Sequence, residues 1–268
     1  MRILFLGDIM GRSGREAVLS RVGGLRRDLG LDFVVANGEN AAGGFGVTPD
    51  LAREILSGGV DVLTGGNHSW DKREIIPFME EEPRILRPVN LPARTPGRGL
   101  GVYRTGSGAV VVVINVMTRL FMELSDDPFA AVDGCLESWR LGREAAVIVV
   151  DVHGEATSEK AALAHHLDGR ASLVVGTHTH VPTADERILR GGTAFQSDAG
   201  MCGDYDSVIG METELAVERF RRRALSRRAE VSRGEGTLCG LVADVDDGTG
   251  LATGVERVAL GGVLDKNN

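Results

Sequence analysis

Histidine, carboxylate and amide side chains follow several short apolar segments of the chain. The apolar segments span residues 3–7, 33–38, 62–66, 147–152 and 173–177, and the residues that follow them are Asp8, Glu39 with Asn40, Asn67 with His68, His153, and His178 with His180. Short apolar runs separated by helical patterns indicate buried parallel strands. Because parallel strands present their carboxyl ends along one edge of a sheet, these side chains should meet there. Imidazole nitrogens and oxygens gathered in one place predict a metal centre.

Two of these histidines stand close together in the segment Thr177-His178-Thr179-His180. Residues two apart on an extended segment point to the same side, so His178 and His180 can share one ion or serve two neighbouring ions. Taken alone, the pair could also be two loop histidines that bind nothing. The acids and amides at the other strand ends favour metal binding.

The acid and amide residues suggest how the ligands divide. A carboxylate such as Glu39 can bridge two cations roughly 3.5–4 Å apart, and Asn40 can add a side-chain oxygen. Asn67 offers a neutral oxygen, which leaves the adjacent His68 to face a substrate and to donate a proton to a leaving oxygen. Taken one at a time, each residue could instead be an ordinary turn residue or a solvated acid.

His153 is flanked by two acids, Asp151 and Glu155. Either acid could fix the imidazole tautomer by bonding the ring nitrogen that faces away from a metal. Among the six histidines, His165 and His166 fall in a predicted helix without such surroundings. We expect these two to be structural or surface residues.

The candidate metal ligands are therefore Asp8, Glu39, Asn40, Asn67, His153, His178 and His180. This set is too large for one tetrahedral zinc ion but suits two ions that share a bridging carboxylate. Nitrogen and oxygen ligands without thiolate favour manganese, iron or zinc over calcium. Two such ions can clamp a phosphoester, lower the pKa of a bridging water and neutralise charge during an in-line displacement.

Composition limits the class of protein. The chain has 268 residues with 43% hydrophobic and 25% charged residues, which is ordinary for a soluble globular protein. No apolar run approaches the ~20 residues that span a bilayer, and no signal peptide is evident. The three cysteines form no CxxC pair, so we expect a reduced, cytoplasmic location. A net charge of −8 argues against broad nucleic-acid binding.

Local patterns place the elements that must position these residues. We expect a helix from a capping box at Ser13 to about Leu29, a helix that begins at Thr48-Pro49, and a helix capped by Asp71. Alternation of strands and helices at the start predicts right-handed crossovers and a doubly wound sheet. In the rest of the chain we expect a loop with short strands over 83–108, and helices over about 130–142 and 158–167. We also expect a strand over 109–116, short strands near 183–188 and 193–195, and a β-hairpin over 237–260. One domain over residues 1–268, with two packed sheets, fits best.

The order of these motifs resembles a known family. The chain is similar to the calcineurin-like metallophosphoesterases, and more narrowly to the bacterial 2′,3′-cyclic-nucleotide 2′-phosphodiesterase group. The motifs that carry the similarity are, in order, Gly7-Asp8, Asn37-Gly38-Glu39-Asn40, Gly65-Gly66-Asn67-His68, His153 and Gly176-Thr177-His178-Thr179-His180. The similarity covers nearly the whole chain. It implies an α/β fold, namely a four-layer αββα sandwich with two central mixed sheets.

The resemblance also implies a dinuclear centre and a reaction. One ion would take Asp8, Glu39, Asn40 and His180, and the other would take Glu39, Asn67, His153 and His178. Iron or manganese is the implied metal, with zinc as an alternative. A metal-bridging hydroxide would attack the phosphorus of a cyclic nucleotide, and His68 would be the proton donor.

Three positions depart from the wider superfamily. The usual Asp-x-His is here Asp8-Ile9-Met10, the usual bridging aspartate is Glu39, and the acid that commonly follows Asn-His is Ser69. The narrower group shares these departures, and Asn40 would fill the place of the missing histidine. Met10 and Asn40 are weaker ligands than imidazole, which bears on the affinity of the first ion.

The sequence thus predicts a metal-dependent phosphodiesterase acting on 2′,3′-cyclic nucleotides or related small phosphoesters. The alternatives are a metal-dependent hydrolase or phosphatase of another substrate class, and a nucleotide-binding regulatory protein with little turnover. No membrane partner is expected, and the sequence leaves open whether the chain forms a homo-oligomer. A basic run over residues 219–228 is interpreted as a solvated helix face or interface, or else as a guide for anionic substrate. The Gly-rich segment 200–206 is interpreted as an ordinary turn, or else as a pocket wall in which Tyr205 stacks on a base.

Overall fold

The computed structural model describes residues 1–222 and 230–265 and contains two β-sheets that pack face to face. The first sheet has the strand order β13-β12-β1-β3-β4. Its strands are β1 (Arg2–Leu6), β3 (Phe33–Asn37), β4 (Val62–Thr64), β12 (Leu238–Val245) and β13 (Ala252–Leu260). Strands β1, β3 and β4 are parallel, whereas β12 is antiparallel to both of its neighbours. The sheet is therefore mixed.

The second sheet has the order β5-β6-β7-β8-β10-β9. Its strands are β5 (Leu100–Arg104), β6 (Val110–Met117), β7 (Val147–His153), β8 (Leu173–Thr177), β9 (Arg187–Ile188) and β10 (Ala194–Gln196). The four central strands are parallel, and the two edge strands are antiparallel to them. A short parallel ladder joins β2 (Asp8–Ile9) to β11 (Met201–Cys202), just beyond the end of β1.

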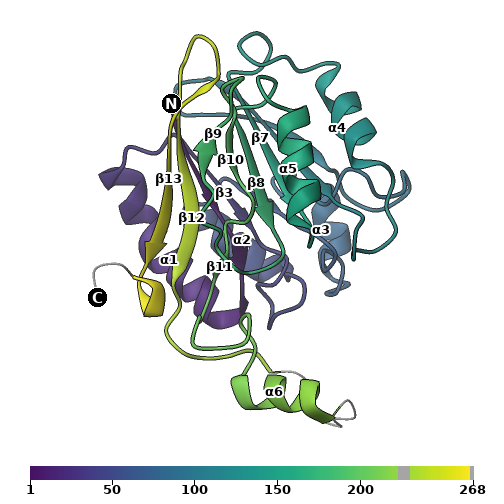
Figure 1. The fold of residues 1–268 in the computed structure, drawn as a ribbon, viewed down its shortest axis with the longest axis vertical. Coiled ribbons are helices and arrows are strands. Elements are labelled where there is room, and N and C mark those ends of the chain that lie inside the picture. The colour runs from purple at the N-terminus through teal and green to yellow at the C-terminus, as the bar shows by residue number, and fades with distance from the viewer. Residues whose placement is uncertain (223–229, 266–268) are drawn as a thin grey trace.

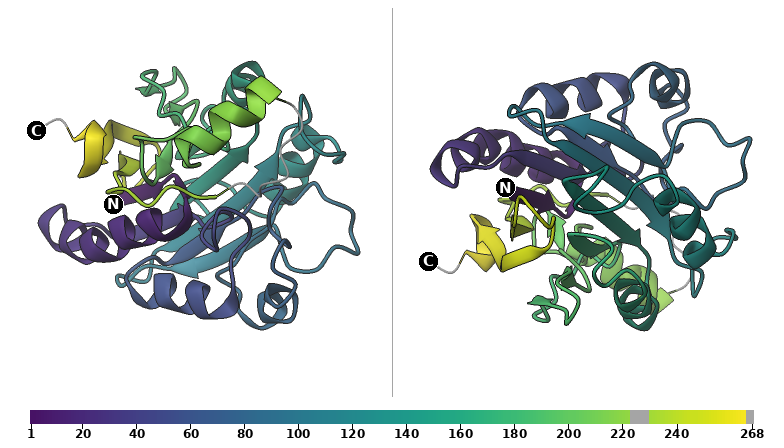
Figure 2. Two further views of the ribbon diagram at one scale, coloured as in Figure 1. Left: turned by 90° about the horizontal axis from the view of Figure 1, so that it is seen from below. Right: turned by 90° about the horizontal axis from the view of Figure 1, so that it is seen from above.

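Helices cover the outer face of each sheet. Figure 1 shows α1 (Gly11–Asp28) on one side of the strands, and α4 (Pro128–Leu136) with α5 (Thr157–His166) on the other. Helices α2 (Pro49–Ser57) and α3 (Ile75–Glu81) pack in the same core as α1. Figure 2 shows the helices lying outside the strands in two further views. These layers confirm the αββα sandwich.

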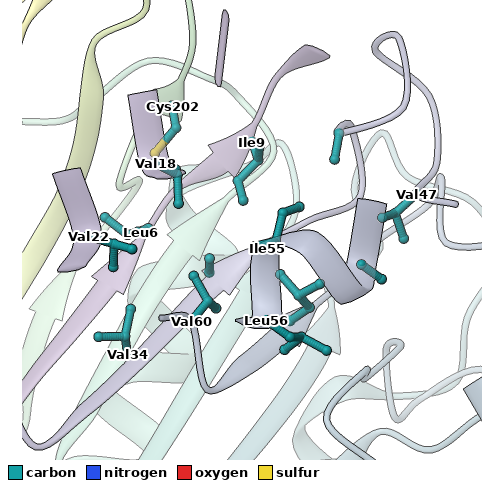
Figure 3. Close-up of a cluster of buried hydrophobic side chains, with 14 of the residues drawn as sticks. Leu6, Ile9, Val18, Val22, Val34, Val47, Ile55, Leu56, Val60 and Cys202 are labelled. Carbon is teal, nitrogen blue, oxygen red and sulfur yellow. The ribbon is translucent and has the colours of Figure 1, made fainter. Parts of the chain in front are cut away.

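Alternation along β1 explains the layers. Leu4 and Leu6 belong to the core under the helices, part of which is drawn in Figure 3, whereas Ile3 and Phe5 belong to the core between the sheets. Successive side chains of a strand point to opposite faces, so a strand with apolar residues at both parities is buried on both sides. The first sheet thus has one face for helices and one face for the second sheet.

The prediction of a doubly wound sheet is wrong for the same reason. Helices α1 and α2 both pack on the face that carries Leu4, Leu6, Val34 and Ala36. The opposite face is covered by the second sheet, so no room is left there for a helix.

Two predicted helix starts are also wrong. Helix α1 begins at Gly11 with Met10 as its N-cap, and the Ser13 hydroxyl donates to the carbonyl of Gly234 instead of capping. Asp71 does not cap α3, which begins at Ile75. By contrast, Thr48 caps α2 as expected and accepts a hydrogen bond from the N–H of Leu51.

The remaining elements follow the predictions with shifted ends. Helix α4 begins two residues earlier than expected, where Asp127 caps it, and it ends at Leu136, also earlier than expected. The expected hairpin is confirmed as β12 and β13. A 3₁₀ turn (Gly262–Leu264) follows it, and α6 (Thr213–Arg222) projects from the body of the fold in Figure 1.

Two findings bear on location. Within residues 1–222 and 230–265, no helix is long and apolar enough to cross a membrane. Cys135, Cys202 and Cys239 are free in the described structure. The cytoplasmic location and the single domain stay predictions.

Candidate metal centre

The ends of strands from both sheets bring the predicted ligands to one place. The first sheet contributes Glu39 and Asn40 after β3 and Asn67 after β4, and Asp8 lies in the short strand beyond β1. The second sheet contributes His153 at the end of β7, and His178 and His180 after β8. Most of these residues are buried, and Asn67 and His178 are half-buried.

Three ligand atoms surround one nitrogen of His153. Its Nε2 lies 3.0 Å from the side-chain oxygen of Asn67, 3.1 Å from Oε1 of Glu39 and 3.2 Å from Nδ1 of His178. Glu39, His153 and His178 also form a group whose donor atoms all lie within 4.8 Å of one another. Such a gathering of a carboxylate, an amide oxygen and two imidazoles suits a cation.

The other nitrogen of His153 has a fixed partner. Its Nδ1 lies 2.9 Å from the hydroxyl of Thr177, and that hydroxyl donates to Oδ1 of Asp151 at 2.7 Å. Since a hydroxyl has one proton to give, it accepts from His153 Nδ1–H. The Nε2 lone pair then faces the ligand cluster. Asp151 is thus the acid that sets the tautomer, as the sequence allowed.

Burial and charge shape the proton affinities here. Burial alone would raise the pKa of Glu39, but the charge and hydrogen bond of His153, with His68, lower it to about 2. Burial alone would lower the pKa of His153, but Glu39 above all raises it to about 9. Burial, with the nearby charge of His153, lowers the pKa of His178 to about 3. The cluster therefore favours a single positive charge at His153 Nε2, which a metal ion can supply in place of a proton.

A second group of ligands leaves oxygens without partners. The amide nitrogen of Asn40 donates to the carbonyl of Gly44 at 3.0 Å, which fixes the side-chain orientation. Its Oδ1, and Oδ1 of Asp8, are buried and have no hydrogen-bond partner within the described residues. Nδ1 of His180 donates to the carbonyl of Ile209 at 2.8 Å, so Nε2 is the nitrogen that faces Asp8 Oδ1, at 3.9 Å. Buried oxygens without partners are costly unless a cation binds them.

The backbone of Gly66 lies close against two of the donor atoms. A Cβ placed on Gly66 would lie 2.3 Å from Oε2 of Glu39 and 2.2 Å from Nε2 of His153. Only a residue without a side chain leaves these donor atoms accessible. The donor set, the unpartnered oxygens and the absence of a side chain at Gly66 all fit bound cations.

His68 lies beside this cluster but is held differently. Its backbone N–H donates to Oε2 of Glu39, whereas its ring Nδ1 lies 2.9 Å from Oδ2 of Asp71. The imidazole and the ring of Phe45 are nearly perpendicular, with a centroid distance of 5.1 Å. Because Asp71 accepts from Nδ1–H, Nε2 is the ring nitrogen left for a substrate, and His68 lines the cavity of the site. Asp71 was expected to cap a helix, and its spacing of three residues after His68 was the signal available in the sequence.

The ligand cluster opens into a cavity of about 810 Å³. The candidate ligands Glu39, Asn40, His178 and His180 line it, and so does His68. Its wall is largely apolar and comes in part from α6 and from the segment before α6. The apolar residues that line it are Met10, Phe45, Val181, Val208, Ile209, Met211, Leu215, Ala216 and Phe220. Arg219 also lines the cavity, while Arg223, Arg227 and Arg228 of the basic run lie outside the described residues.

Tyr205 does not line this cavity. Its hydroxyl donates to the carbonyl of Met201 and accepts from the N–H of the same residue. The structure therefore favours an ordinary turn over base stacking, since the Tyr205 hydroxyl bonds the backbone of the turn after β11. The aromatic residues of the cavity are Phe45 and Phe220, which the sequence did not mark.

Comparison with known proteins gives consistent matches over nearly the whole chain. A family profile described as YmdB-like protein matches residues 4–258. A 2′,3′-cyclic-nucleotide 2′-phosphodiesterase of Bacillus subtilis (strain 168) is 44% identical over 260 residues, which cover 97% of each chain. A hypothetical protein of Thermus thermophilus has a structure that matches with a TM-score of 0.90 at 40% identity, over 98% of this chain and 100% of that one. A phosphatase of Mycoplasma pneumoniae matches with a TM-score of 0.88 at 29% identity, over 97% and 93%.

Proposed function

The chain belongs to the YmdB-like family, and from this membership and the geometry of the site we propose that it hydrolyses 2′,3′-cyclic nucleotides. Membership agrees with the resemblance to metallophosphoesterases and makes the chain a phosphoester hydrolase. The observation that carries the finer proposal is the convergence of nitrogen and oxygen donors from both sheets beside an imidazole that a carboxylate orients.

We assign two cation sites to the ligand cluster. Asp8, Glu39, Asn40 and His180 would hold one ion, and Glu39, Asn67, His153 and His178 the other. The unpartnered oxygens of Asp8 and Asn40 support the first site, and the gathering around His153 Nε2 supports the second. Manganese, iron and zinc suit these donors. When bound, two such ions would hold the phosphate oxygens and lower the pKa of the attacking water.

His68 is the residue assigned to proton transfer. Asp71 keeps Nδ1 occupied, so Nε2 is the ring nitrogen assigned to the substrate. In the reaction, water adds to phosphorus and releases one proton to solvent as the bond to the ribose 2′-oxygen breaks. His68 gives its Nε2 proton to that oxygen, and the products are a free 2′-hydroxyl and a 3′-phosphate. General acid catalysis of this kind contributes roughly 10²–10⁴-fold to a rate.

The cavity suits the nucleoside part of such a substrate. Its volume of about 810 Å³ lies within the range common for small-molecule pockets. Phe45, Leu215 and Phe220 offer apolar surface for a base, and Arg219 adds one cation to the wall. The metal sites then supply the attraction for the phosphate that a chain of net charge −8 otherwise lacks.

The test compares wild type, His68→Ala and His166→Ala on a panel of phosphoesters after reloading with Mn²⁺ or Fe²⁺. His166 is a matched control because it bonds Asp133 away from the site. We expect wild type and His166→Ala to convert 2′,3′-cyclic nucleotides to 3′-phosphates. His68→Ala should retain both metals by elemental analysis and lose roughly 10²–10⁴-fold in kcat.

Other outcomes would contradict the proposal. Binding of cyclic nucleotide without turnover by the metal-loaded wild type would favour a regulatory protein. Hydrolysis of amides but not of phosphoesters would favour another hydrolase class. Loss of metal from His68→Ala would contradict the role of His68 as proton donor.

A further inference from the structure

A fully buried ion pair lies behind the loop that carries the two histidines after β8. Nζ of Lys160, in the first turn of α5, lies 2.8 Å from Oδ2 of Asp198, and both side chains have 0% exposure. Removing two charges from water is costly, and a buried pair often stabilises a fold no better than apolar residues would. The contacts of this pair suggest another role.

The pair ties together the backbone segments that present ligands. Nζ of Lys160 also donates to the carbonyl of Thr177 at 2.7 Å, directly before His178. Oδ2 of Asp198 accepts the N–H of Thr179 at 3.1 Å, between the two histidines. Oδ1 of Asp198 accepts the N–H of Gly200 at 2.9 Å. The carbonyl of Gly200 in turn accepts the N–H of Asp8 at 3.1 Å, so the links reach a ligand of the first sheet as well.

The histidine loop needs such support because its backbone is strained. His178 has φ of 98° and His180 has φ of 64°, which is the left-handed region that residues with a side chain rarely adopt. Strained residues of this kind persist only where the surroundings hold them in place. Thr179 stands between them, and its N–H is held by Asp198. The Lys160 side chain also packs tightly against the backbone before the histidines, since a Cβ on Gly176 would lie 2.7 Å from Cδ of Lys160.

We propose that Lys160 and Asp198 are positioning residues that hold His178, His180 and Asp8 in the geometry required for two cations. The proposal rests on the metal centre assigned above. Neither residue lines the cavity, so neither is assigned contact with substrate. Loss of the pair should therefore weaken metal binding while leaving the chemical step intact once metal is bound. Mutations of residues that support metal ligands cost roughly 10–100-fold in metal affinity.

The experiment measures the affinity of metal-free protein for Mn²⁺ by calorimetry. It also measures kcat for hydrolysis of a 2′,3′-cyclic nucleotide as a function of the Mn²⁺ concentration. The variants are Lys160→Met, Asp198→Asn and the double variant Lys160→Met with Asp198→Asn. The double variant leaves no unpaired charge and is the one most able to fold. In each folded variant we expect roughly 10–100-fold weaker Mn²⁺ binding. At saturating Mn²⁺, kcat should return to within a few-fold of wild type.

Arg26→Met serves as the control. Arg26 pairs with Asp61, and Asp61 accepts the N–H of Val34 near the start of β3, at the end of the strand away from the site. This variant should lower stability without changing Mn²⁺ affinity. A folded double variant that binds Mn²⁺ like wild type would overturn the positioning role. A wild type that binds no Mn²⁺, Fe²⁺ or Zn²⁺ would instead overturn the metal centre itself.

Discussion

The imidazole of His153 is where proton binding and metal binding compete. Thr177 fixes its Nδ1, and its Nε2 faces a carboxylate, an amide oxygen and a second imidazole. Without a cation, burial disfavours a proton on Nε2, but Glu39 outweighs burial and raises the pKa of His153 to about 9. Any ion bound to that nitrogen must displace this proton.

This competition predicts a pH dependence of the metal-free protein. The pKa of His153 rises from 6.5 to about 9 on folding, so its proton stabilises the fold fully below pH 6.5 and no longer does so above about 9. We expect the free energy of unfolding of chelator-treated protein to fall by on the order of 3 kcal/mol between these values. Denaturant titrations at several pH values measure it.

The metal-loaded protein provides the control for this prediction. Because the ion replaces the proton, the stabilisation by added Mn²⁺ should grow between pH 6.5 and about 9. Equal stabilisation by Mn²⁺ at both pH values would contradict the competition. The lowered pKa of Glu39 affects stability in a different, more acidic pH range. The stabilisation of the fold by the ionised Glu39 carboxylate is present above pH 4.5 and is lost only as the pH falls toward 2.

At the residue scale, chemistry was easier to predict than geometry. The position of each candidate ligand at a strand end was enough to predict that Asp8, Glu39 and His153 meet. The partner of His68 was missed because an aspartate three residues after a histidine is also a common helix cap, and only the folded turn brings it to Nδ1. The wall residue Phe220 was missed because the other residues that line the cavity, such as Phe45 and His68, are distant from it in sequence.

At the scale of single elements, the turn after β4 is built around Gly66. Its carbonyl accepts from the hydroxyl of Ser69, and the Ser69 hydroxyl in turn receives the N–H of Gly66. The chain then presents Asn67 and His68 in sequence. Gly66 is not among the glycines with positive φ, so a methyl group there meets no backbone strain. The obstacle to a side chain is the ligand cluster itself.

Gly66→Ala should therefore act on the metal centre. Its methyl group would lie within 2.3 Å of Glu39, which both assigned ion sites share, and of His153, a donor of the second site. We expect the folded variant to lose at least one of two equivalents of Mn²⁺ by elemental analysis, with turnover falling in parallel.

Gly24→Ala is the matched substitution for that experiment. Gly24 lies in α1, and within the described structure a Cβ there would meet no atom within 4 Å. Alanine at this position should stabilise the helix by about 0.5–1 kcal/mol and leave metal content unchanged. Full metal content in Gly66→Ala would show that the space beside Gly66 is not needed for an ion.

Element boundaries show which local signals were sufficient. Thr48-Pro49 predicted the start of α2 because hydroxyl capping and proline at the first turn act within a few residues. Ser13 carried a similar signal, yet its hydroxyl bonds Gly234, which is more than 200 residues away. A long-range partner of this kind leaves no trace in the local pattern.

At the scale of the whole molecule, the site forms only where the two sheets meet. Glu39, Asn40 and Asn67 follow strands of the first sheet, and His153, His178 and His180 follow strands of the second. Strand periodicity predicted buried strands correctly. The pattern along the chain also favoured two packed sheets, but it predicted a doubly wound first sheet as well, because a helix and a second sheet both present apolar surface to a strand. The resemblance to a family supplied the four-layer order αββα.

Packing between the sheets should therefore control metal affinity, and two buried phenylalanines allow a matched test. Phe5 (0% exposed) lies in the core between the sheets, whereas Phe195 (1% exposed) lies in the core between the second sheet and its helices. Phe5→Leu and Phe195→Leu should each cost about 1–3 kcal/mol of stability, as for other core substitutions. Only Phe5→Leu changes how the sheets sit against each other, so only it should weaken Mn²⁺ binding, as measured by calorimetry on metal-free protein. Equal Mn²⁺ affinity in the two variants would mean that the strand ends hold the ligands independently of the packing between the sheets.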